Sequence, residues 1–444
     1  MLPVVTPRLA ALAAAGALIA LIADARWLIA WNVLLGIATA LDWLRAPRPE
    51  RLTVRRETPA VLTQGMHGPV TWTVGNPTRR LLRVALADEL ARGLGAPTRR
   101  VALTVPARGS ARRSVELHPT RHGRFVLDRV TVRVTGSWGL AARQRWRSLP
   151  GVLTVYPPFR SLPQIELRLQ RARQLQLGDR SVRLHGGGMD VEGLREYTVD
   201  DEVRRIDWAA TARASRAIVR TYRAERNQTV LILVDCGRTM AALVGGAARG
   251  AADDPGPIAR LEHAIDAAQS VTRLATGLGD RVGMIAFADR VLTVLPPRSQ
   301  ADQLRRLTIG LAGIRARLVE SDHHAAFVTA LSRFPRRALL LVLTELANEA
   351  AAQTLLPALG LVRRRHLVVV GSVRDPVVES WRTGAADTVE RTYRRAAAIR
   401  TLDQRVVTTA RLRAAGATVV DAVPGELAAA LADAYLDTKA AGRL

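Results

Sequence analysis

The stretch "TVLILVDCGRTM", residues 229–240, decides the fold of the C-terminal half of this chain. It is an apolar run that ends in Asp235 and then breaks into small and polar residues. A short run that is apolar throughout predicts a strand buried on both faces of a parallel sheet. Because ligands of such sheets bind at the carboxyl ends of the strands, Asp235 is placed at the ligand-facing edge.

Downstream of this stretch, apolar runs alternate with helical patterns. Further strands are expected at 281–289, 337–346 and 366–373, and the longest helix between them at 258–278. This alternation predicts a doubly wound α/β domain over residues 229–444. No phosphate-binding loop of the G-x-x-x-x-G-K-[ST] or G-x-G-x-x-G kind follows the first strand, so we do not expect the domain to bind a nucleotide.

The preceding segment, residues 159–228, is predicted to be a connector that carries a dense charged motif. We favour an ion-pair network that clamps it onto the next domain, because no nucleophile and base with defined roles emerge from it. A hydrolase that uses the acidic residues of 200–207 is the alternative. The motif residues are Arg195, Glu196, Tyr197, Asp201, Arg205, Asp207 and Trp208.

Residues 49–158 show the alternation of apolar and polar residues that is typical of strands, separated by Gly, Pro and Asn turns. This pattern predicts an antiparallel, immunoglobulin-like β-sandwich. Trp138 and Trp146 are expected to pack in its core or at a sheet edge, and a binding surface is the alternative for them.

Residues 1–48 contain two uncharged stretches, 9–23 and 27–41, which predict a transmembrane helical hairpin. The arginines that follow the second stretch place the bulk of the protein in the cytoplasm by the positive-inside rule, so a multi-pass protein of the inner membrane is expected. A cleaved signal peptide is the rival interpretation, because Ala23-Asp24-Ala25 has the small-x-small form of a cleavage site.

The composition is strongly basic, with 65 basic against 39 acidic residues and a formal charge of +26. The basic residues are dispersed along the chain and nearly all are arginine, so no specific nucleic acid is expected, although binding through the basic surface stays an alternative. The sole cysteine, Cys236, excludes an intramolecular disulfide and a multi-cysteine zinc site, and it is expected to be a buried, inert thiol.

Three stretches together carry a family resemblance: residues 192–240, "VRDP" at 373–376 and the tail at 412–439. They resemble the bacterial, membrane-anchored "domain of unknown function fifty-eight" family, whose members end in a von Willebrand factor A-like domain. The resemblance implies that architecture for residues 229–444. It also implies a MoxR-type AAA+ ATPase as partner, in assembly, maturation or envelope stress.

The resemblance further implies a degenerate metal-ion-dependent adhesion site at the end of the first strand. In the A-domain superfamily this strand ends in D-x-S-x-S, which corresponds here to Asp235, Gly237 and Thr239. The remaining ligands for Mg²⁺ would be Ser321, or Asp322 in its place, and Glu345. Because Gly237 has no side-chain oxygen and Glu345 replaces an aspartate, we favour a site that keeps Asp235 for hydrogen bonds over one that binds Mg²⁺. The adjacent His323 and His324 are expected to be solvated.

The sequence as a whole predicts a membrane-anchored adaptor that is not an enzyme and needs no cofactor. It would present its A-like domain to a MoxR-type AAA+ ATPase or to a client protein. The alternatives are a divalent-metal-dependent ligand-binding protein, a hydrolase and a nucleic-acid-binding protein.

Overall fold

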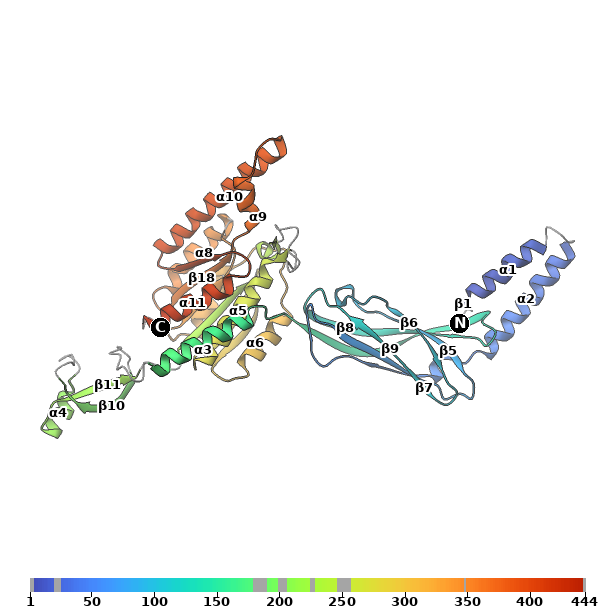
Figure 1. Ribbon diagram of the computed structural model, residues 1–444, viewed down its shortest axis with the longest axis horizontal. Coiled ribbons are helices and arrows are strands. Elements are labelled where there is room, and N and C mark those ends of the chain that lie inside the picture. Colours follow the sequence, from blue (N-terminus) through green and yellow to red (C-terminus); the bar gives the residue numbers. More distant parts are fainter. Residues whose placement is uncertain are drawn as a thin grey trace. The chain divides into compact units, whose positions relative to one another are not determined.

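The computed structural model describes residues 4–19, 25–178, 190–198, 206–223, 228–245, 257–346 and 349–441. It is a multidomain assembly of helices and sheets that divides into two compact units, Met1–Pro158 and Phe159–Leu444 (Figure 1). Each unit is described by itself below.

The first unit begins with β1 (Val4–Val5), α1 (Pro7–Ile19) and α2 (Ala25–Arg45). Among the described residues, only the helical stretch Arg26–Arg51 is long and apolar enough to cross a membrane, judged by length and composition. The 13 residues of α1 extend only about 20 Å at 1.5 Å per residue, against about 30 Å of bilayer hydrocarbon. The predicted pair of membrane spans is therefore not supported. One candidate span near the N-terminus is supported.

The rest of the first unit forms two sheets that are antiparallel apart from one short parallel pairing. The larger sheet has the order β1-β9-β8-β5-β6, with β3 beside β9, and the smaller has the order β2-β4-β7. Their strands are β2 (Thr53–Glu57), β3 (Leu62–Thr63), β4 (Gly68–Gly75), β5 (Leu82–Asp88), β6 (Arg100–Val105), β7 (Ser110–Leu117), β8 (Gly123–Thr135) and β9 (Ala141–Tyr156). Two short 3-10 helices, η1 (Pro49–Arg51) and η2 (Arg92–Leu94), complete the unit.

Alternate residues of these strands build one hydrophobic core, in which Trp72 is buried together with Val, Leu and Phe side chains. The indole Nε1 of Trp72 donates a hydrogen bond of 2.7 Å to Asp88. Neither Trp138 nor Trp146 packs in the core, because both are exposed on this unit. Packing at a sheet edge, the other part of that prediction, stays a prediction. A guanidinium lies over each ring, Arg45 over Trp138 and Arg129 over Trp146, at 5.3 Å from the centroid in both cases.

The second unit is built on a six-stranded sheet with the order β16-β15-β12-β17-β18-β19, parallel except for the edge strand β16. The strands are β12 (Thr229–Asp235), β15 (Arg281–Phe287), β16 (Val291–Arg298), β17 (Leu339–Leu343), β18 (Leu367–Val373) and β19 (Thr418–Ala422). The predicted strand at 229–235 is thus confirmed residue for residue.

Helices cover both faces of this sheet. Val230 and Ile232 of β12 point into a core shared with α3 (Leu162–Gly178), α5 (Arg260–Gly277), α6 (Gln303–Ala312) and α11 (Leu427–Ala440). Leu231 and Leu233 point into a second core, shared with α7 (His323–Arg333), α8 (Glu349–Val362) and α10 (Val389–Ala414). Because α3 contributes to the first core, residues 162–178 belong to the sheet domain and are more than a connector.

Seven smaller elements complete the described part of the second unit. The antiparallel hairpin of β10 (Asp190–Glu196) and β11 (Ile218–Arg223) brackets α4 (Trp208–Ala214). A short pair, β13 (Leu243–Val244) and β14 (Ile258–Ala259), precedes α5. The 3-10 helix η4 (Arg238–Ala241) follows β12, and α9 (Pro376–Thr383) leads into α10, which is drawn in red in Figure 1.

Candidate functional site

The order of the strands places one site at the centre of the sheet. β12 is first in the chain and lies between β15 and β17, so the chain winds away from it in two directions. In open α/β sheets, ligands bind at the carboxyl ends of the strands where the winding reverses. Asp235 ends β12 there, and Thr344 and Glu345 follow β17 directly.

The carboxylate of Asp235 is buried and is held by three donors of the protein itself. Its Oδ1 accepts hydrogen bonds from the backbone N–H of Gly237 at 2.8 Å and from the hydroxyl of Ser321 at 2.5 Å. Its Oδ2 accepts a hydrogen bond from the hydroxyl of Thr344 at 2.6 Å. Asp235, Ser321 and Thr344 therefore form one closed cluster, to which the predicted candidates Asp235 and Ser321 both belong.

Gly237 is required by this cluster. A β-carbon built on it would lie 2.0 Å from Ser321 Oγ and 3.0 Å from the carbonyl oxygen of Val319. The hydroxyl that the adhesion motif would place on residue 237 is thus absent for a steric reason, because the hydroxyl of Ser321 fills its space.

His323 extends the cluster inward. Its Nε2 lies 3.3 Å from Thr344 Oγ1 and its Nδ1 lies 3.0 Å from Thr354 Oγ1. Since Thr344 gives its only proton to Asp235, His323 Nε2 is the donor in its contact with Thr344. Burial lowers the pKa of His323, although the carboxylates of Asp235 and Asp322 oppose this. The prediction that His323 is solvated is wrong, whereas the neighbouring His324 is exposed.

Cys236 follows Asp235 and is fully buried, as expected. Burial and the adjacent Asp235 carboxylate raise the pKa of its thiol. A thiol that stays protonated is a poor nucleophile and a poor metal ligand.

Glu345, the second acidic candidate, is held by two arginines. Arg405 from α10 places Nη1 2.5 Å from Glu345 Oε1, and Arg260 from the start of α5 places Nε 2.7 Å from Oε2. The guanidinium of Arg405 also binds both carboxylate oxygens of Asp421 on β19 and the hydroxyl of Ser372 on β18. Burial lowers the pKa of Arg405, but Asp421 and Glu345 outweigh it, and the net effect is a raised pKa.

These contacts test whether a divalent ion fits the site. Mg²⁺ requires several oxygen ligands in octahedral array. Both oxygens of Asp235 already accept protein donors, Gly237 supplies no side-chain oxygen, and Glu345 is neutralised by Arg260 and Arg405. For Thr239, the backbone carbonyl accepts a hydrogen bond of 3.4 Å from Arg260. The residues present do not fit a divalent ion, and two guanidinium groups lie against Glu345, the carboxylate that would have been its fourth ligand.

The outer surface of the site, which we call the rim, carries exposed apolar and charged side chains. Leu318 is 84% exposed, and its loop is fixed by hydrogen bonds from Arg317 N to Cys236 O and from Arg238 N to Val319 O. Two exposed ion pairs flank Leu318, Arg238 with Glu320 and Arg317 with Asp289. The rim consists of Arg238, Asp289, Arg317, Leu318 and Glu320.

The charged motif of residues 192–226 is only partly described. Asp201 and Arg205 lie outside the described residues, and only the backbone of Arg195 is described, in β10. Asp207 is the N-cap of α4, where it accepts hydrogen bonds from the N–H groups of Ala209 and Ala210.

The other motif residues lie in or beside the same hairpin. Glu196 forms an exposed ion pair with Arg216 at 3.4 Å, and the N–H of Tyr197 donates to the carbonyl of Ala217. Trp208 is exposed at the start of α4. The clamp onto the sheet domain stays a prediction.

The participation of Arg260, Arg405, Asp421 and His323 was not predicted. Each is separated from Asp235 by many residues, and no local motif marks it. The sequence did carry one indication of this part of the site, the pair Thr344-Glu345 at the end of a buried strand. Two polar residues there indicate a site at the same sheet edge.

Comparison with protein families gives one match to this chain. The model of the family described as "Protein of unknown function DUF58" matches residues 193–415, about half of the chain. That range includes the second half of β10, all of β11, and Asp235, Ser321, Thr344 and Glu345.

Similarity to individual proteins is more distant. An uncharacterized protein of Mycobacterium bovis is 29% identical over 206 residues, which cover 45% of this chain and 59% of that protein. The matched part thus spans less than two thirds of that relative. Among solved structures, BatB from Bacteroides thetaiotaomicron is 16% identical with a TM-score of 0.30, covering 48% of this chain and 100% of that chain. The mussel byssus protein PTMP1, solved with a zinc-occupied MIDAS motif, is 12% identical with a TM-score of 0.27. That match covers 49% of this chain and 46% of that chain. Both TM-scores are too low to identify the fold.

Proposed function

This chain belongs to the DUF58 family of proteins of unknown function, and from that premise we propose that it is a membrane-anchored interaction protein without enzymatic activity. Its sheet domain is a von Willebrand factor A-like domain. The central β12, the antiparallel edge strand β16 and the position of Asp235 at the winding reversal support this assignment.

α2 is the membrane anchor in this proposal. Arg45, Arg48 and Arg51 follow its apolar stretch, and such a charge bias favours the cytoplasmic side for the chain that comes after it. We call the two-sheet part of the first unit, residues 53–156, the β-module. Both the β-module and the sheet domain would then lie in the cytoplasm, beneath the inner membrane.

The contrast between the interior of the site and its rim carries the proposal. Inside, Asp235 is hydrogen-bonded by protein donors and Glu345 is ion-paired with two arginines, which removes the general base or metal ligand that a reaction centre would require. Outside, Leu318 stands exposed between two ion pairs on an anchored loop. An apolar anchor within a polar ring is the usual anatomy of a protein-binding surface.

The partner we propose is a MoxR-type AAA+ ATPase, with a client protein as the second possibility. The choice of the ATPase rests on the family resemblance of residues 192–240. The choice of surface rests on the rim. No cofactor is required, since the arginines supply the positive charge that a metal ion would otherwise bring to Glu345.

Crosslinking in native membranes, followed by solubilisation and mass spectrometry of the captured proteins, tests this proposal. Wild-type chain should recover a MoxR-type ATPase or a client, and Leu318→Asp should lower that recovery by about tenfold or more, as expected for an interface anchor. Val389→Asp is the matched control, because Val389 is an exposed apolar residue at the start of α10. Recovery of neither kind of protein, or equal losses from the two variants, would overturn the proposal.

A further inference from the structure

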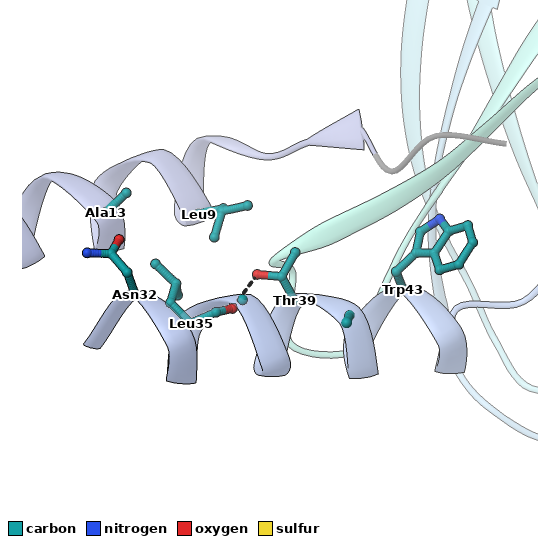
Figure 2. A pocket seen from close by; sticks show the side chains of 8 residues that line it. Leu9, Ala13, Asn32, Leu35, Thr39 and Trp43 are labelled. Atoms are coloured by element: carbon teal, nitrogen blue, oxygen red, sulfur yellow. Dashed lines mark hydrogen bonds between the residues drawn. The ribbon is translucent and has the colours of Figure 1, made fainter. Parts of the chain in front are cut away.

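An apolar groove lies between α1 and α2 in the first unit. Leu9 and Ala13 of α1 face Leu35 and Thr39 of α2 across it, and Gly36 and Ala40 complete its wall (Figure 2). Its volume is about 510 Å³, within the range of ordinary ligand sites.

Two polar side chains of the groove, Thr39 and Asn32, each donate a hydrogen bond inside α2. Thr39 Oγ1 donates to the carbonyl of Leu35 at 2.7 Å, and Asn32 Nδ2 donates to the carbonyl of Leu28 at 2.8 Å. Each of these side chains thus uses a donor within α2 itself. Most of the lining is apolar, contributed by Leu9, Ala13, Leu35, Gly36 and Ala40. The occupant that fits this lining is a hydrocarbon chain.

Positive charge gathers where the groove meets the β-module. Trp43 lines that end, and the guanidinium of Arg143 lies over its ring at 4.6 Å while donating to its backbone carbonyl at 2.9 Å. Arg8, next to Leu9, reaches the carbonyl of Trp138 at 3.5 Å, and Arg45 lies over the Trp138 ring. Within the described part of the chain, no ion pair neutralises any of the three arginines.

The helices that form the groove are fixed to the β-module that carries part of the positive charge. Asp42, buried in the last turns of α2, accepts hydrogen bonds from the backbone N–H groups of Trp138, Leu140 and Ala141 at 2.9–3.1 Å. A β-carbon on Gly136 would lie 2.4 Å from this carboxylate, so the turn between β8 and β9 fits closely around it. On the other side, Thr6 Oγ1 donates to the carbonyl of Gly139 at 2.6 Å.

We propose that this is a binding site for an anionic phospholipid. One acyl chain lies in the groove between α1 and α2, and the phosphate of the headgroup lies among Arg8, Arg45 and Arg143. Guanidinium groups match phosphate oxygens in geometry and charge, and tryptophans such as Trp43 and Trp138 suit the level of the headgroups. Basic pockets between membrane helices on the cytoplasmic side are suited to acidic headgroups. The inference rests on α2 being a membrane anchor, as proposed above, and on α1, which is too short to span the bilayer, lying against α2 within it.

The test uses the full chain, reconstituted in nanodiscs that contain equal amounts of phosphatidylglycerol and phosphatidylcholine, then released for native mass spectrometry. Wild-type protein should retain phosphatidylglycerol in preference to phosphatidylcholine. Each of Arg8→Gln and Arg45→Gln should lower that preference by about fivefold, since one basic residue near an anionic surface contributes about that factor. Equal retention of the two lipids by wild type would overturn the headgroup assignment.

The groove is tested separately by filling it. Gly36 has no atom within 4 Å of the position of an added β-carbon, so Gly36→Ala and Gly36→Leu extend into open space. Retention of both lipids should fall in two steps across this series. Val33→Leu adds bulk to an exposed position of α2 and serves as the control. Undiminished retention by Gly36→Leu would remove the acyl-chain site.

Extraction of membranes with alkaline carbonate separates this inference from the proposed function. If the chain is released, the anchor itself is wrong and the lipid site is lost with it. If the chain stays in the membrane fraction but shows no lipid preference, only the lipid site is refuted.

Discussion

Ser321 places its hydroxyl 2.5 Å from Asp235 Oδ1, at the point where a side chain on residue 237 would have to begin. The loop before α7 thus supplies from 86 residues away the hydroxyl that an adhesion motif would supply from two residues away. A side chain on residue 237 and the hydroxyl of Ser321 cannot occupy this space together, and this relationship governs how the site responds to substitution.

Gly237→Ser is expected to destabilise the protein by about 1–3 kcal/mol, because an overpacked core forces side chains off their preferred positions. Chemical denaturation of the full chain in detergent measures the loss. The double variant Gly237→Ser, Ser321→Ala should recover much of it, since the colliding oxygen is gone and residue 237 can donate to Asp235 instead. Additive losses in the double variant would contradict the steric account.

Addition of about 5 mM MgCl₂, or removal of divalent ions with a chelator, is expected to shift the melting temperature by less than about 1 °C. A ligand stabilises a fold only when it binds the folded state, and the oxygens of Asp235 and Glu345 are already taken. Titration calorimetry is the second measurement. A saturable isotherm with one Mg²⁺ per chain, lost in Asp235→Ala, would show that the site does hold a metal ion.

Arg405→Met is expected to cost about 3–5 kcal/mol, because it leaves Glu345 and Asp421 buried without the shared guanidinium. Arg391→Met on the same helix is the matched control. Its ion pair with Asp387 is exposed, and such pairs contribute about 0.5 kcal/mol or less. Urea denaturation of the two variants should therefore give very different midpoints, and similar midpoints would argue that the Arg405 network is dispensable.

His263 predicts a pH dependence of stability. Burial, together with nearby Arg160, lowers the pKa of His263 to about 4, while Glu262 opposes this. Because the folded-state pKa lies below the unfolded value of about 6.5, the unfolded state binds more protons below that pH, and stability is lost as pH falls from about 6.5 toward 4. We expect wild type to lose about 1–2 kcal/mol more than His263→Gln between pH 7 and pH 5. Parallel stability curves for the two proteins would refute this.

The sheet could be predicted from the sequence because a strand buried on both faces is marked by its own residues. The limits of β12 were predicted without error, and those of β18 within one residue. β16 was not predicted, since its Pro296-Pro297 pair argues against a strand and is tolerated only at an edge. The helices α9 and α10 between β18 and β19 were not predicted either.

The site was predicted in position but not in chemistry. The place of Asp235 follows from the strand pattern, and the absence of a hydroxyl on residue 237 is visible in the sequence. That Arg405 pairs with Glu345 across 60 residues is a property of the packed fold, since α10 must pack against β19 and α8 before the two side chains meet. A basic chain with this many arginines gives no indication of which one is buried.

The three hydrogen bonds of Asp42 join the end of α2 to the turn between β8 and β9 without an intervening linker. Helices tilt to match the thickness of the bilayer around them. If α2 spans the membrane, spin labels on Ile37 and Val126 should keep one separation in thin and thick bilayers. The β-module would then tilt together with α2. A change in bilayer thickness would therefore rotate this module on the cytoplasmic side.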